Sequence, residues 1–129
     1  MIVDSSAILA ILLAERDAKT FAEALAGALR PRMSAATYIE LVSVCDRRLG
    51  IEAVAMLDHL IERSRIELEP FTVDQVRWAR YARLSYGAGR HPASLNFGDC
   101  FTYALAKSSG QPLLFKGNDF SQTDLDSAI

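Results

Sequence analysis

Short apolar runs alternate with longer helical patterns along the chain, and this alternation constrains the fold more than any other feature. The runs cover residues 1–3 and 112–115, while 66–69 alternates apolar and acidic residues, as in a strand with one wet face, and 32–34 is a further candidate strand. Runs this short are typical of buried strands bounded by turns or helix starts. Because helical patterns separate them, the strands are expected to pair in parallel through crossover connections. The sequence therefore predicts an α/β fold, a three-layer α/β/α sandwich around a central parallel sheet.

Six stretches between these runs place apolar residues at helical spacing. The expected helices cover residues 7–15, 18–29, 36–49, 52–64, 72–86 and 97–108. Ser5 and Ser6 are suited to cap the first helix, while Gly50 and Gly110 are well placed to end the third and the sixth. Two glycines and a proline make 87–95 the longest expected loop. The tail after residue 122 is expected to add a final edge strand.

Length and composition indicate one soluble globular domain over residues 1–129. Half of the residues are hydrophobic and 23% are charged, which is typical of a chain with a substantial core and excludes a disordered one. The apolar run 7–14 is too short to span a bilayer, and no basic segment precedes it as in a signal peptide. We therefore expect a cytoplasmic protein without membrane association. Cys45 and Cys100 form no CxxC motif, so buried free thiols are expected.

A net charge of −2 does not by itself indicate a nucleic-acid-binding protein. The basic residues are mostly arginine, which suits bidentate contacts to phosphate better than lysine does. Solvated helix faces remain the ordinary interpretation of most of them. The acidic residues carry more information than this balance.

Two acidic residues stand at the ends of predicted strands. Asp4 follows the run 1–3, and Asp119 comes shortly after the run 112–115. In open parallel sheets, ligands bind outside the carboxyl ends of the strands. Each residue also has an ordinary structural explanation, an N-cap for Asp4 and a turn residue for Asp119.

Two further acidic residues lie early in predicted helices. Glu40 sits among apolar residues, a poor position for a merely solvated charge, but it also has capping-box spacing from Thr37. Asp99 has the same spacing from Asn96, and an acid in a first turn suits the helix dipole. Spacing alone therefore leaves structural and chemical roles open for all four acids.

A divalent ion would make a cluster of these four carboxylates tolerable. Carboxylates at close range repel one another and raise each other's pKa unless a cation neutralises them. Mg²⁺ binds a few carboxylates together with water and substrate phosphate oxygens. A site with only oxygen ligands argues against zinc. Mg²⁺ or Mn²⁺ is therefore the expected cofactor.

Three segments and one helical glutamate carry a resemblance to a known family. The segments are Met-Ile-Val-Asp-Ser-Ser-Ala at 1–7, Leu-Asn-Phe-Gly-Asp-Cys at 95–100 and Leu-Phe-Lys-Gly-Asn-Asp-Phe at 114–120. With Glu40 in an early helix, they resemble PIN-domain nucleases, in particular the VapC toxins of bacterial toxin–antitoxin pairs. The resemblance covers essentially the whole chain. Its most specific part is Asn-Phe-Gly-Asp-Cys leading into a helix.

The resemblance implies four or five parallel strands and metal-dependent cleavage of RNA phosphodiester bonds, often in structured RNAs such as tRNA. The acidic quartet of the family corresponds to Asp4, Glu40, Asp99 and Asp119. Ser6 matches a polar position beside the first acid, and Asp124 is a candidate accessory acid.

The mechanism expected from this resemblance gives the four acids different roles. Asp4, Asp99 and Asp119 would hold one or two ions, which bind a phosphate oxygen and activate water. Glu40 would complete the metal site through a water or orient the attacking water. The expected substrate-binding residues are Ser6, Asn96, Asn118 and Arg90.

The resemblance also implies protein partners. A toxin of this type is held inactive by a small antitoxin, here of the VapB type, and homodimers are common. Apolar residues of the helices 36–49 and 52–64, for example Val54, Leu57 and Ile61, could form such a surface or belong to the core.

Two other enzyme classes place an acid after a first strand. A haloacid-dehalogenase phosphatase needs a second Asp two residues after the first, where this chain has Ser6. A phosphoacceptor receiver domain needs an acidic pair beside its first strand, and none is present. The stronger alternative is a PIN-like module that binds RNA or a partner without cutting. RNA cleavage, unlike metal binding, separates this module from a nuclease.

Overall fold

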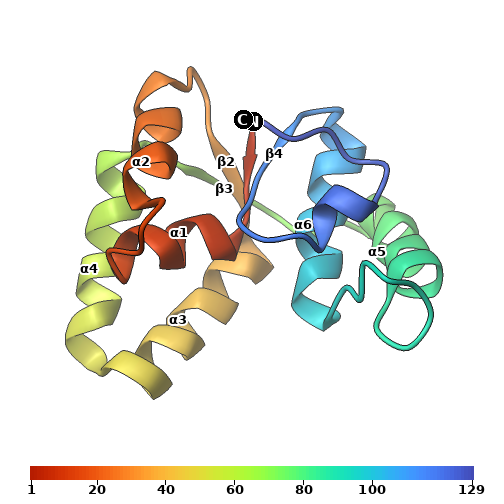
Figure 1. Ribbon diagram of the computed structural model, residues 1–129, viewed down its shortest axis with the longest axis horizontal. Helices are drawn as coiled ribbons and strands as arrows, with labels where there is room; N and C mark the ends of the chain where they lie inside the picture. The colour runs from red at the N-terminus through yellow and green to blue at the C-terminus, as the bar shows by residue number, and fades with distance from the viewer.

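The computed structural model describes residues 1–129 as an α/β fold of four strands and six helices (Figure 1). The strands are β1 (Ile2–Val3), β2 (Arg32–Ser34), β3 (Glu67–Glu69) and β4 (Leu113–Leu114). The helices are α1 (Ser5–Leu12), α2 (Ala18–Gly27), α3 (Ala35–Leu49), α4 (Ile51–Arg63), α5 (Val73–Tyr86) and α6 (Phe97–Ser109), followed by a 3₁₀ turn, η1 (Phe120–Gln122). The predicted α/β fold with a parallel sheet is confirmed.

The sheet has the strand order β3-β2-β1-β4, and every pair is parallel. Ile2 lies opposite both Arg32 and Leu113, so β1 occupies an inner position. The tail adds only a single bridge between Leu113 and Ser127, not the edge strand that the sequence predicted. With all strands parallel, their carboxyl ends meet at one edge of the sheet.

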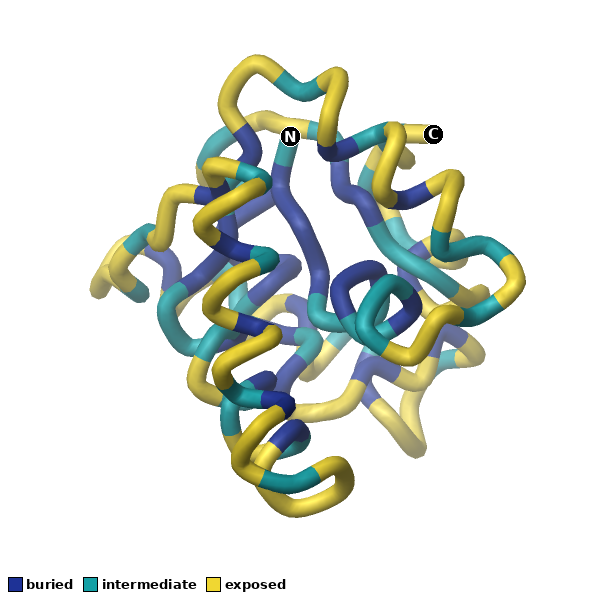
Figure 2. The backbone as a smooth tube through the Cα atoms, turned by 90° about the vertical axis from the view of Figure 1, so that its left-hand side faces the viewer, coloured by how far each residue is buried: buried dark blue, intermediate teal, exposed yellow.

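The two faces of the sheet pack against different helices. Val3 and Leu114 point into a core formed with α1 to α4, while their neighbours Ile2 and Leu113 point into a core formed with α5 and α6. This division follows from the two-residue period of a strand. Figure 1 shows the sheet between the two groups of helices, and Figure 2 shows the buried central strands flanked by helices with exposed outer faces.

Two helix starts differ from the sequence prediction. Helix α1 begins at Ser5, because Asp4 is the N-cap and its carboxylate accepts a hydrogen bond from the Ser6 amide at 3.0 Å. Helix α3 is capped by Ser34, so the predicted capping box of Thr37 and Glu40 is wrong. In each case the capping residue ends the preceding strand or follows it directly.

The capping box at the start of α6 is confirmed. The Asn96 side chain accepts from the Asp99 amide, and the Asp99 carboxylate accepts from the Asn96 amide, each at 2.9 Å. The helix ends at Gly110 in the left-handed conformation, as predicted. Both cysteines are buried free thiols, also as predicted.

The apolar residues of α4 belong mainly to the core rather than to an open docking surface. Leu57 is fully buried, Ile61 is buried, and Val54 packs against the same cluster. Of the two alternatives left open for these three residues, the structure supports the core, because the face that carries them packs on α1 and α3. No helix of the chain has the length and apolar character needed to cross a membrane.

Adjacent positions on α4 give a test of this packing. We expect Leu57→Ala to lower the free energy of unfolding by about 2–5 kcal/mol, since it leaves a cavity in the core. Met56→Ala is the matched control, because Met56 is 56% exposed. We expect it to change stability by less than about 1 kcal/mol. Urea unfolding followed by circular dichroism measures both, and equal losses would contradict the assigned core.

Candidate active site

The four acids predicted to act together lie around the carboxyl edge of the sheet. Asp4 directly follows β1, Asp119 lies in the segment after β4, Glu40 is in the second turn of α3 and Asp99 is in the first turn of α6. Their charges interact, because Asp4, Asp119 and Glu40 all raise the pKa of the Asp99 carboxyl. Residues from the two ends of the chain thus meet through the parallel sheet.

Asp4 is the buried member of this group, with only 3% of its surface exposed. One carboxylate oxygen accepts from the Thr102 hydroxyl at 2.8 Å. The other accepts from the Ser6 hydroxyl at 2.6 Å and from the Ser6 amide at 3.0 Å. Donors on both oxygens satisfy the hydrogen-bonding capacity of the buried carboxylate and fix its orientation. Asp4 therefore caps a helix and remains in the acidic cluster at the same time.

The hydrogen bonds of Asp4 continue into neighbouring elements. The Thr102 proton goes to Asp4, so the Thr37 hydroxyl, 3.2 Å from that of Thr102, acts as the donor of that pair. The Ser6 hydroxyl accepts from the Lys116 amide at 2.9 Å, beyond the end of β4. Sequence reasoning missed Thr102 and Thr37. The spacing of Thr102, three residues after Asp99 on one helix face, could have indicated it.

Asp99 is half-buried, and its pKa rises from 3.8 to about 7. Burial is the main cause, and the neighbouring carboxylates add to it. The Asn96 amide opposes the rise by donating to one carboxylate oxygen, Oδ2. The capping interaction therefore does not offset burial among like charges. Its second oxygen, Oδ1, takes no hydrogen bond from the protein.

Glu40 enters the cluster from α3. Burial is the first cause that raises the pKa of its carboxyl, the charge of Asp4 adds to it, and the Ser5 hydroxyl acts in the opposite direction. Its carboxylate lies directly against Gly98, where an added Cβ would be 1.7 Å from Glu40 Oε2. Gly98 is thus the residue that makes room for Glu40 beside Asp99.

Asp119 is exposed and precedes η1 without a capping hydrogen bond from its side chain. The turn-residue explanation therefore gives no role to this carboxylate. It remains free to approach the cluster through the charge interaction with Asp99.

A cavity of about 910 Å³ opens beside these acids between α3 and the start of α6. Ser5, Glu40 and Asp99 line it, and so do two basic residues of α3, Arg47 and Arg48. Sequence reasoning missed both arginines. They follow Glu40 by seven and eight residues, which is the spacing of a shared helix face. The cavity therefore combines carboxylates with guanidinium groups.

The expected substrate-binding residues differ in their surroundings. Asn96 lines the cavity, although its side-chain oxygen is used by the capping box. The Ser6 hydroxyl is used by Asp4 and Lys116. Asn118 and Arg90 are exposed, the latter in the loop 87–95. Of this set, only Asn96 is among the residues that line the acidic cavity.

Asp124 does not join the quartet as an accessory acid. Its carboxylate accepts from the Tyr103 hydroxyl at 2.7 Å and forms an ion pair with Lys107 at 2.8 Å. These partners lie one and two helical turns beyond Asp99 on α6, which places Asp124 away from the cluster.

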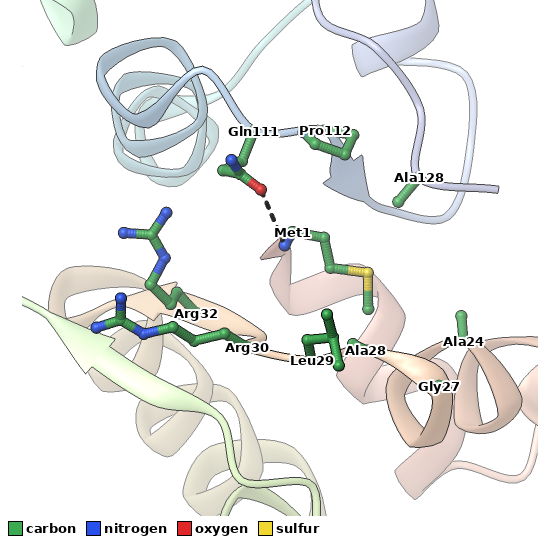
Figure 3. Close-up of a pocket in the computed structure, with 10 residues that line it drawn as sticks. All are labelled: Met1, Ala24, Gly27, Ala28, Leu29, Arg30, Arg32, Gln111, Pro112 and Ala128. Carbon is green, nitrogen blue, oxygen red and sulfur yellow. Dashed lines mark hydrogen bonds between the residues drawn. The ribbon is translucent and has the colours of Figure 1, made fainter.

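A second cavity, of about 570 Å³, lies at the opposite, amino-terminal edge of the sheet (Figure 3). Met1 donates through its amino group to Gln111 there, at 3.4 Å. The two arginines that line it are engaged elsewhere, Arg30 with Glu67 at 2.9 Å and Arg32 with Glu69 at 3.6 Å. It contains no part of the acidic quartet.

The donor chemistry of the quartet fits a hard divalent cation. All four side chains offer carboxylate oxygens, and the charges of Asp4, Asp119 and Glu40 add to the effect of burial in raising the pKa of Asp99. No three acidic, histidine or cysteine side chains are close enough together to hold a metal ion as they stand. Mg²⁺ keeps several of its waters in protein sites, so carboxylates at this spacing fit an ion held partly through water.

Comparison with known proteins gives the family. The PIN domain profile matches residues 1–125. The chain belongs to the PIN-domain family, and its relatives within it are VapC proteins. Ribonuclease VapC28 of Mycobacterium tuberculosis is 49% identical over 130 residues, covering 100% of this chain and 98% of the relative. Ribonuclease VapC30 of the same species is 46% identical over 125 residues, covering 97% and 95%.

Solved structures agree with the PIN fold. VapC20 of M. tuberculosis, described as a toxin that cleaves the sarcin–ricin loop, superposes with a TM-score of 0.76 at 19% identity over 96% of this chain and 95% of that one. A toxin–antitoxin complex from Klebsiella pneumoniae contains a chain with a TM-score of 0.69 at 16% identity, covering 95% and 92%. The predicted membership of the VapC group of PIN domains is confirmed.

The raised pKa of Asp99 gives a stability prediction for the metal-free protein. A carboxyl whose pKa is about 7 in the folded state and 3.8 in the unfolded state opposes folding fully above pH 7 and not at all below about pH 4. Asp99→Asn removes this charge and keeps an oxygen for the Asn96 amide. At pH 8 in EDTA we expect it to raise stability by roughly 1–2 kcal/mol, with solvent screening included.

The measurement is the melting temperature between pH 4.5 and pH 8.5. The gain should shrink as the pH falls, and added Mg²⁺ should stabilise the wild type more than the variant. Asp74→Asn, in the first turn of α5, is the matched control. A gain that is equal at all pH values would show that the charge of Asp99 is not its source.

Proposed function

We propose that this chain is a divalent-metal-dependent endoribonuclease, the toxin of a VapBC-type toxin–antitoxin pair. The observation that carries the proposal is the convergence of four carboxylates on one edge of the sheet, where burial and, after it, the three neighbouring charges raise the pKa of Asp99 to about 7. The relatives named ribonucleases, which match the chain along nearly its full length, support the reaction class. Mg²⁺ or Mn²⁺ is the proposed ion.

The proposed metal ligands are Asp4, Asp99 and Asp119, with Glu40 joining through a water. When bound, the ion supplies positive charge for the carboxylates and the substrate phosphate, and it lowers the pKa of a water molecule. Asp4 is held ready by Thr102 and Ser6, while Asp99 offers its free Oδ1. The raised pKa of Glu40 makes its carboxylate a stronger base than an ordinary glutamate, which suits a residue that accepts a proton from the attacking water.

The basic residues of the cavity have the corresponding role toward the substrate. Arg47 and Arg48 line the same cavity as Asp99, and their guanidinium groups suit phosphate oxygens. Asn96 keeps its amide group for substrate, since its oxygen caps α6. Arg90 and Asn118 are proposed as outer contacts, and Ser6 is better described as a positioning residue for Asp4.

The proposed partners follow from the same identification. The substrate is RNA, and the protein acts in the cytoplasm as a homodimer that a VapB-type antitoxin inhibits. The toxin–antitoxin complex among the similar structures supports an antitoxin partner. The alternative is a PIN-like module that binds RNA without cutting it, and cleavage distinguishes the two.

The first test is cleavage of purified total RNA with Mg²⁺ or Mn²⁺ against EDTA. We expect discrete products that require the ion and disappear in Asp99→Asn, because the substitution removes a ligand oxygen and its charge. Asp74→Asn should cleave like the wild type. Cleavage that survives EDTA or the Asp99 substitution would disprove the proposed site, and RNA that stays intact but bound would favour the non-cleaving module.

Gly98 gives a second test, in which stability and activity change in opposite directions. Gly98→Ala removes the space that the Glu40 carboxylate occupies, but that carboxylate is the flexible end of a side chain and can move away. Alanine also favours a helix over glycine by about 0.5–1 kcal/mol. We therefore expect an unchanged or higher melting temperature together with cleavage reduced by about tenfold or more.

The matched control is Gly27→Ala in α2, where an added Cβ meets nothing within 4 Å. It should preserve both stability and cleavage. Full activity in Gly98→Ala would show that the position of Glu40 against α6 is unimportant for the reaction.

A further inference from the structure

A third cavity adjoins the acidic one, on the other side of the first turn of α6. Its volume is about 420 Å³, within the range of pockets that take small organic ligands. Three phenylalanines form much of its wall, namely Phe71, Phe97 and Phe101. The ring of Phe101 packs edge-to-face on both others, with centroid distances of 4.9 Å to Phe71 and 5.1 Å to Phe97.

Phe97 is the exposed residue that, together with Phe101, lies between this cavity and the acidic one. It lines both cavities, stands two residues before Asp99 and is 78% exposed. The fold does not need an aromatic side chain here, because the cap of α6 is made by Asn96 and Asp99 and Phe97 belongs to neither apolar core. A large apolar side chain in water beside a catalytic groove has an exposed face available to a ligand.

Arginines flank the aromatic wall on both sides. Arg80 and Arg83 of α5 line the third cavity, and Arg47 and Arg48 of α3 line the acidic one. None of the four forms an ion pair in the structure, and Arg83 only donates to the Ala88 carbonyl at 3.3 Å. Exposed aromatic rings between unpaired guanidinium groups are typical of surfaces that bind single-stranded nucleic acid, with bases on the rings and phosphates on the cations.

We propose that this third cavity is a nucleobase subsite of the ribonuclease. A base adjacent to the cleaved phosphodiester stacks on Phe97 and enters the space bounded by Phe71 and Phe101. Arg80 and Arg83 contact the phosphate that follows it, while the scissile phosphate lies in the acidic cavity. The proposal rests on the proposed function, and it makes single-stranded or unpaired RNA the substrate form.

A second copy of the chain is a less suitable occupant of the same surface. In a symmetric dimer the same patch meets itself, so the arginines of the two copies would be brought together without acidic partners. Desolvated like charges oppose such a contact, whereas the phosphates of RNA complement them. Charge complementarity therefore favours the nucleic acid.

The test uses the full chain carrying Asp99→Asn, in Mg²⁺, with a single-stranded RNA octamer that contains 2-aminopurine. Quenching of the 2-aminopurine emission reports stacking of the base. We expect Phe97→Ala to weaken binding about 10- to 100-fold and to remove the quenching that depends on the protein. Phe97→Leu should behave similarly, since it keeps apolar bulk without a ring, and Phe97→Tyr should restore both signals.

Val73→Ala is the matched control, because Val73 is exposed on α5 and lines neither cavity. In the otherwise wild-type chain, Phe97→Ala should raise KM for the octamer with kcat changed by less than about threefold. Octamer binding and quenching that are unchanged in Phe97→Ala would overturn the subsite while leaving the ribonuclease assignment intact. If quenching depends on Phe97 but the protein cleaves no RNA, the base-binding subsite is supported and the ribonuclease assignment is overturned.

Sedimentation of the same variants measures their oligomeric state and tests whether a second copy of the chain occupies this surface instead. If Phe97→Ala dissociates a dimer, Phe97→Leu preserves it, and octamer binding is indifferent to both, the surface is an interface between copies and the subsite is wrong. An unchanged oligomeric state together with the loss of base stacking in Phe97→Ala supports the nucleobase subsite.

Discussion

The buried carboxylate of Asp4 is the interaction on which the rest of the site depends. It accepts from Thr102 on α6 and from Ser6 on α1, and Ser6 in turn holds the Lys116 amide after β4. One side chain thus ties β1, two helices and the final strand together at the carboxyl edge of the sheet. A buried charge is tolerable only with such a set of donors, because an unpaired one would lose its hydration without compensation. The same donors fix the direction in which Asp4 meets its acidic neighbours.

The acids around Asp4 lower the stability of the metal-free fold at the place where the proposed ion binds. Asp99 is half-buried among like charges, and burial together with these charges raises its pKa to about 7, while Glu40 lies against α6 where Gly98 leaves room for it. Repulsion of this kind opposes folding, and the two helix caps and two apolar cores outweigh it. A divalent cation removes the repulsion, so metal binding and the stability of the site are coupled. Gly98 has no side chain, and the space left on α6 is the space that the Glu40 carboxylate of α3 occupies.

Much of the fold could be predicted because its signals are local. The runs that became β1, β2 and β4, the capping box of α6 and the end of that helix at Gly110 depend on neighbouring residues and on strand and helix periodicity. Predictions failed where a local signal had a competitor elsewhere. The spacing of Thr37 and Glu40 fits a capping box, but the N-cap of α3 is Ser34. The Thr37 hydroxyl is instead buried and hydrogen-bonded to that of Thr102. Similarly, Asp124 looks like an accessory acid until its bonds to α6 are known.

The sequence by itself determined the α/β class, the positions of the four acids at strand ends and helix starts, and the resemblance that names their family. It did so because hydrophobic periodicity and short motifs are properties of neighbouring residues. Tertiary structure decided which residues face one another, including Glu40 against Gly98, Thr102 beneath Asp4 and Arg47 across the groove. It also placed an exposed ring of Phe97 between two cavities. These contacts join segments that are far apart in the chain, and only the packing of helices on a common parallel sheet brings them together.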